Sequence, residues 1–115
     1  MTAVLATLIV LAFAGLGTMK VLAVPAMVQR AEHLGLTASF YRRIGALEIL
    51  GAVGLALGAV LPWLGVAAAV GLLLLLGGAV VAHLRGGDGG RDLVPAVAVG
   101  LAVLGYLALM VVGHG

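Results

Sequence analysis

Long apolar stretches dominate this chain and constrain its fold more than any single motif. They lie at about 3–24, 40–61, 63–85 and 93–112. A helix of about 20 residues rises about 30 Å, enough to cross the hydrocarbon core of a bilayer. Of the 115 residues, 64% are hydrophobic and 9% are charged, and a soluble domain this small would have no interior for so many apolar side chains. We therefore expect an all-α integral membrane protein, an antiparallel four-helix bundle that forms a single domain over residues 1–115.

Prolines, glycines and one polar segment separate the apolar stretches. Pro25 ends the first stretch, because a proline disfavours helical backbone at the preceding residue. Segment 27–40 has apolar residues at helical spacing with charged residues between them, which predicts a short interfacial helix broken near Gly35. Thr37 is a suitable N-cap for the second long helix. No Lys or Arg precedes the first stretch, so we expect a retained helix rather than a removed signal peptide.

Basic residues set the expected orientation in the membrane. Four crossings joined by short loops would bring all six basic side chains to one side: Lys20, Arg30, Arg42, Arg43, Arg85 and Arg91. Cytoplasmic loops of membrane proteins are enriched in Lys and Arg. We therefore expect a multi-pass protein whose basic loops face the cytoplasm and whose two termini lie outside.

Three ionisable residues fall at similar depth on the basic side, each in a different long helix. Lys20 precedes the end of the first stretch, Glu48 follows the start of the second, and His83 precedes the end of the third. At about 1.5 Å per residue, each lies within about 8 Å of the membrane boundary. Ionisable groups in membrane helices generally face the bundle interior and pair with one another. We expect a polar cluster of these three residues, either a structural ion pair capped by the histidine or a ligand-binding pocket.

Tyr41, Arg42 and Arg43 open the second long stretch. Paired arginines at a helix mouth are typical membrane anchors, and contact with an anion is the alternative. No metal site is expected, because the histidines and carboxylates lack close ligand spacing. The absence of cysteine excludes thiol chemistry, disulfides and iron–sulfur ligation, and no cofactor motif is evident. A net charge of +2 on so apolar a chain argues against nucleic-acid binding.

Three spaced motifs carry a family resemblance: Gly17-Thr18-Met19-Lys20, Arg42-x-x-Gly45-x-x-Glu48 and Ala79-x-x-x-His83-x-x-x-x-Asp88. By these motifs, and along nearly its whole length, the chain resembles the DoxX-like family of small four-helix bacterial membrane proteins. The resemblance implies a bacterial inner (plasma) membrane location and one shared site for Lys20, Glu48 and His83. The family is named after a subunit associated with a quinone-linked sulfur oxidoreductase, and some members are linked to oxidative-stress membrane complexes.

The leading functional hypothesis is a non-enzymatic membrane protein. It would bind a lipid or quinone at the polar cluster, or support a membrane-associated redox complex. A small proton-coupled transporter using the intramembrane carboxylate is the first alternative, but only 4% of the residues are aromatic, and a pocket for aromatic cations would need more. An assembly or scaffold subunit, with a homo-oligomeric or membrane-protein partner in the lipid bilayer, is the second. Catalysis has the least support, because one intramembrane carboxylate rather than a pair leaves acid–base work to His83 or Lys20.

Overall fold

The computed structural model describes residues 1–87 and 89–113, with only the backbone of Arg91 and Asp92, so Asp88 of the third motif lies outside the described residues. This part of the chain contains five helices and no strand: α1 (Thr2–Val21), α2 (Pro25–His33), α3 (Ala38–Leu57), α4 (Pro62–Arg85) and α5 (Gly90–Val111). The all-α prediction is confirmed.

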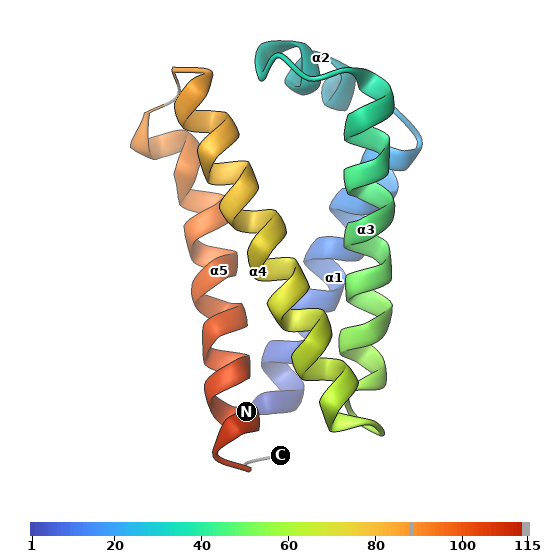
Figure 1. Ribbon diagram of the computed structural model, residues 1–115, viewed down its shortest axis with the longest axis vertical. Coiled ribbons are helices and arrows are strands. Elements are labelled where there is room, and N and C mark those ends of the chain that lie inside the picture. Colours follow the sequence, from blue (N-terminus) through green and yellow to red (C-terminus); the bar gives the residue numbers. More distant parts are fainter. Residues whose placement is uncertain (88, 114–115) are drawn as a thin grey trace.

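The four long helices lie side by side, and the short helix α2 crosses one end of them (Figure 1). α3 packs between α1 and α4, and α5 packs against both α4 and α1, whereas the backbones of α1 and α4 do not approach each other closely in the described part of the chain. α1 begins and α5 ends at the end of the molecule opposite α2 (Figure 1). α1, α4 and residues Leu93–Val111 of α5 are long and apolar enough to cross a membrane. α3 is as long as α1 but carries three charged residues, Arg42, Arg43 and Glu48.

The first long helix ends at Val21, before the expected boundary at residue 24, because the backbone reverses at Ala23. The Ala23 N–H donates to the Lys20 carbonyl (3.0 Å) and the Val24 N–H donates to the Met19 carbonyl (3.3 Å). This pair of bonds is the Schellman pattern, which requires a left-handed residue after the helix. Ala23 has a φ of 52°, whereas the equivalent residues after the other described helix ends with positive φ are glycines: Gly35, Gly87 and Gly113.

Replacing Ala23 with glycine is expected to stabilise the protein. An L-residue in left-handed backbone is less stable by about 1–2 kcal/mol, and glycine avoids most of this, less its larger loss of entropy on folding. We expect Ala23→Gly to raise the free energy of unfolding in mixed micelles by about 0.5–1 kcal/mol. The matched control is Ala67→Gly on the exposed side of α4, which should lower it by about 0.5–1 kcal/mol. A loss of stability in Ala23→Gly would contradict the assigned backbone conformation.

The Thr37 prediction is confirmed at the start of α3. The Phe40 N–H donates to Thr37 Oγ1 at 3.0 Å, which satisfies one of the amides that a helix start leaves free. The same turn follows Gly35, whose positive φ of 73° ends α2. The polar segment therefore folds as expected, as a short helix followed by a glycine break.

The buried core occupies only the half of the molecule farther from α2. Its members come in pairs from the four long helices: Ile9, Phe13, Ala52, Leu55, Ala69, Leu72, Val103 and Tyr106. Beyond Leu72, α4 has no fully buried residue, and α5 has none before Val103 among the residues whose burial is described. A separate small cluster packs α2 onto α3 through Met27, Ala31 and Tyr41. The α4–α5 hairpin is therefore packed against α1 and α3 at one end and not at the other.

Glycines allow α3 and α4 to touch at the packed end. A Cβ at Gly58 would lie 2.6 Å from the Gly65 Cα, and the Tyr106 hydroxyl of α5 fills the space beside both glycines. A Cβ at Gly54 would lie 3.0 Å from the Ala68 Cβ. These contacts fix the point from which α4 and α3 diverge toward α2.

Candidate functional site

α1 and α3 cross in backbone contact near the α2 end. A Cβ at Gly45 would lie 2.7 Å from the Gly17 carbonyl oxygen and 2.6 Å from the Lys20 Cβ. A Cβ at Gly17 would lie 2.7 Å from the Gly45 carbonyl oxygen and 3.3 Å from the Glu48 Cβ. Helices approach this closely in membrane proteins where small residues face each other. The crossing therefore sets Lys20 beside Glu48.

Lys20 Nζ donates to Glu48 Oε1, and the two side chains form a salt bridge. Only 4% of the Glu48 side chain is exposed, compared with 13% of the Lys20 side chain. Glu48 thus lies beneath Lys20, and the ammonium is the more accessible member of the pair. A buried pair of this kind contributes little net stability itself, but removing one member leaves an uncompensated charge.

Tyr41 completes the surroundings of the ammonium. Lys20 Nζ lies 4.9 Å from the centroid of the Tyr41 ring, within the range of a cation–π interaction. The ring is covered by Met27 and Ala31 of α2, which are each 1% exposed. Arg30, also on α2, lies close enough to Tyr41 for its charge to act on the phenol group.

The two arginines of α3 have different surroundings. Arg42 Nε donates to the Val21 carbonyl at 3.0 Å, so the guanidinium caps the last turn of α1. A cation at a helix C-terminus also interacts favourably with the helix dipole. Arg43 is exposed, on the side of α3 that carries the exposed Leu47 and Leu50. The sequence did not indicate the contact of Arg42 with α1, because a guanidinium reaching a backbone carbonyl across a helix crossing leaves no spacing pattern.

His83 lies in the last turn of α4 and is half-buried. The structure joins Lys20 of α1 to Glu48 of α3, while His83 belongs to α4, which packs on α3 and α5, and its place in the cluster stays a prediction. Among the described residues, no group of three or more His, Asp or Glu side chains is placed to hold a metal ion.

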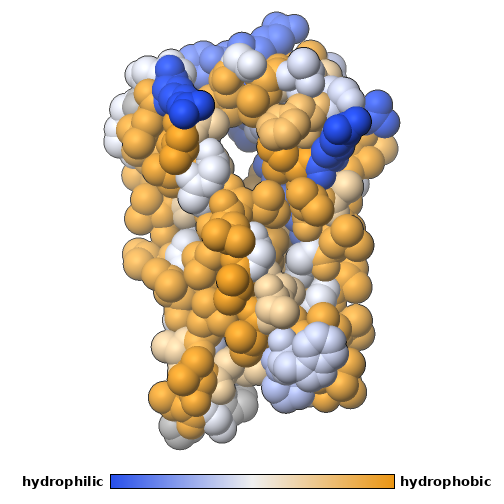
Figure 2. Space-filling view, viewed as in Figure 1, coloured by the Kyte–Doolittle hydropathy of each residue, from blue (hydrophilic) through white to orange (hydrophobic). Residues whose placement is uncertain are grey.

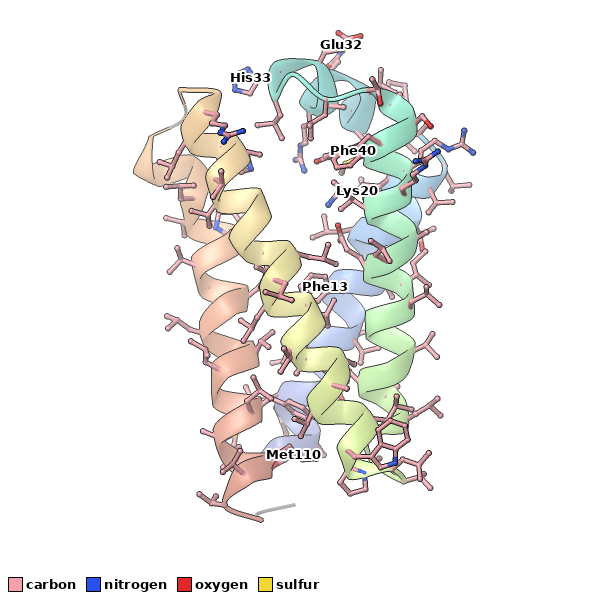
Figure 3. The ribbon with its side chains drawn as sticks, viewed as in Figure 1. Phe13, Lys20, Glu32, His33, Phe40 and Met110 are labelled. Atoms are coloured by element: carbon pink, nitrogen blue, oxygen red, sulfur yellow. The ribbon has the colours of Figure 1, made fainter. Side chains whose placement is uncertain are left out.

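A lateral opening separates α3 from α4 below α2. We define it by its two ends: Leu72 packs on Gly51 at the lower end, and Gly86 meets Leu34 and His33 at the upper end. A Cβ at Gly86 would lie 3.5 Å from Leu34 Cδ2 and 3.6 Å from His33 Nε2. Figure 2 shows this opening as a gap through the surface beneath α2, and in the same view Figure 3 shows Lys20 between the ribbons of α3 and α4. Lys20, the more exposed member of the pair, therefore lies at the height of this opening.

A comparison with known protein families decides the affiliation of the chain. The model of the DoxX-like family matches residues 4–111. The chain belongs to the DoxX-like family. No curated protein and no solved structure matches this DoxX-like chain.

The second motif of this DoxX-like chain now has a physical explanation. Arg42, Gly45 and Glu48 are spaced three apart, so they lie along one face of α3. All three contact α1: the arginine caps it, the glycine lets its backbone approach, and the glutamate pairs with Lys20. The motif is thus the α1-facing side of α3.

Proposed function

We propose that this DoxX-like chain crosses a bacterial inner (plasma) membrane four times, with α3 as a crossing beside the three more apolar helices. Its length and its position between α1 and α4 support this assignment. The most hydrophilic residues gather at the end covered by α2, and apolar residues cover the sides (Figure 2). Because basic residues favour the cytoplasmic side, this end faces the cytoplasm and both termini lie outside.

The function proposed for the chain is non-enzymatic binding of a lipid-soluble ligand, a lipid or a quinone, in the lateral opening. The observation that carries this proposal is the buried Lys20–Glu48 pair at the height of an opening between α3 and α4. Polar groups at one end of an otherwise apolar space suit an amphiphile, whose head needs partners and whose tail does not. In this role the protein would hold such a ligand for a membrane-associated redox complex. The transporter and scaffold alternatives stay predictions.

The proposal is tested by filling the opening. Ala79 follows Leu72 by two turns of α4, so it lies on the same face, toward the opening, and it is half-buried. We expect Ala79→Phe to remove most of the lipid or quinone that co-purifies with the wild-type chain, measured by native mass spectrometry, while the free energy of unfolding changes by less than about 1 kcal/mol.

The matched control is Ala67→Phe on the same helix. Ala67 is exposed and lies beside the packed half of the molecule, so the same increase in volume falls outside the opening. This variant should retain the ligand. Equal retention by both variants, or no ligand on the wild-type chain, would overturn the proposal.

A further inference from the structure

Positive charge exceeds negative charge around the lateral opening. Arg30 lies on α2 within electrostatic range of Tyr41, Lys20 is seen between α3 and α4 in Figure 3, and Arg85 belongs to the last turn of α4. Of the two described carboxylates near this end, Glu48 is already paired and lies beneath Lys20. Glu32 points away from the opening on the outer side of α2 (Figure 3). A neutral head group would not compensate this excess of positive charge.

We propose that the opening selects an amphiphile with an anionic head group, and specifically an anionic membrane lipid. This inference rests on the proposed function and names the ligand class. The head group binds between Arg30 and Lys20, where the Tyr41 hydroxyl supplies a further hydrogen-bond donor. Lys20 keeps its bond to Glu48, because an ammonium has three donors and one of them serves the carboxylate.

The position of Arg30 on α2 supports this assignment. Met27 and Ala31 form the buried stripe of α2, and Arg30 flanks that stripe one turn after Met27. Its side chain is exposed rather than buried, so it is available to a ligand that enters below α2. The charges of Arg30 and Glu48 both act on the Tyr41 phenol group.

The apolar walls of the opening favour a lipid over a small soluble anion. Below Lys20 the facing residues are Gly51 and Leu72, and the half-buried Ala79 follows two turns later on the same face of α4. On the opposite side of the bundle, a shallow groove between α1 and α5 is lined by apolar residues, among them Leu8, Ala12 and Val99. An acyl chain that runs down the α3–α4 opening from the head-group position therefore meets apolar side chains.

The test compares two variants that remove the same charge at the same end of the protein. Arg30→Gln removes the cation of α2 whose charge acts on Tyr41, whereas Arg43→Gln removes an exposed cation from the first turns of α3. Full-length protein is titrated with phosphatidylglycerol and with phosphatidylcholine of identical acyl chains, and bound lipid is counted by native mass spectrometry.

For the wild-type chain we expect phosphatidylglycerol to bind about tenfold more tightly than phosphatidylcholine. Arg30→Gln should reduce the affinity for phosphatidylglycerol about fivefold or more and leave phosphatidylcholine unchanged, while Arg43→Gln should change either by less than about twofold. Tyr41→Phe keeps the ring over Lys20 and should weaken phosphatidylglycerol binding severalfold.

Three outcomes would overturn the inference. If Arg30→Gln and Arg43→Gln behave alike, the preference reflects surface charge and not the opening. If a quinone or phosphatidylcholine binds as tightly as phosphatidylglycerol and Ala79→Phe expels it, the proposed function holds and the anionic head group is wrong. If glycerol 3-phosphate displaces phosphatidylglycerol at equal concentration, the occupant is a soluble anion. Absence of any bound lipid or quinone defeats the proposed function itself.

Discussion

Replacing Glu48 with leucine is expected to lower the free energy of unfolding by about 3–5 kcal/mol, because it leaves the Lys20 ammonium buried without its counter-charge. The Tyr41 ring and the carbonyl end of α1 still surround the ammonium, so we expect the lower part of this range. The measurement is reversible unfolding of the purified chain in mixed micelles.

A double variant separates the lost charge pair from the altered packing. Lys20→Met together with Glu48→Leu removes both charges and keeps similar volumes, and it should recover most of the stability lost by the single change. The matched control is Glu32→Leu, which removes a carboxylate from the exposed face of α2 and should change stability by less than about 0.5 kcal/mol. If Glu48→Leu lowers the free energy of unfolding no more than Glu32→Leu does, the Lys20 ammonium is hydrated through the opening and the salt bridge is not required for stability.

Replacing Gly45 with alanine should destabilise the protein by about 2–3 kcal/mol, which is large for a single added methyl group. The new Cβ would meet the Gly17 carbonyl oxygen at 2.7 Å and the Lys20 Cβ at 2.6 Å. The carbonyl belongs to the helix backbone and cannot rotate away. α1 and α3 must therefore separate, which also pulls Lys20 away from Glu48. The free energy of unfolding and cross-linking between the two helices both report this change.

Gly71→Ala is the matched control for the glycine prediction. Gly71 is a helical glycine in α4 with no atom within 4 Å of its missing Cβ. Alanine has the higher helix propensity, so this change should raise stability by up to about 1 kcal/mol. Equal effects at Gly45 and Gly71 would show that α1 and α3 do not cross in backbone contact.

Hydropathy and local chemistry suffice to predict most of the helices. The apolar stretches locate α1, α4 and α5, and Thr37 marks the start of α3. Counting residues from the expected helix ends placed Lys20 and Glu48 at one depth, and the structure contains a salt bridge between them. Depth follows from the rise per residue, which is a fixed property of the helix. What the pair binds stays a proposal.

The rotation and tilt of the helices could not be predicted from hydropathy or from counting residues along the chain. The chain has 19 glycines, and nothing in their spacing shows that Gly17 and Gly45 make a backbone contact while Gly71 makes none. The predicted end of α1 was wrong because Ala23 adopts the left-handed backbone conformation that follows many helices. Glycine is the usual residue in that conformation, and the sequence has alanine there instead. The lateral opening depends on the angle between α3 and α4, which is set by contacts far along the chain, so no local pattern predicts it.

The Tyr106 hydroxyl packs between Gly58 and Gly65 and holds one end of the α4–α5 hairpin against α3. The hairpin can therefore tilt about this contact. The contact lies at one end of the helices, and the lateral opening lies near the other. Over the length of about 30 Å of a twenty-residue helix, a tilt of a few degrees displaces the far end by much more than it disturbs the pivot. Changes in bilayer thickness or lateral pressure that tilt the hairpin would therefore alter the width of the opening while the core around Tyr106 stays packed.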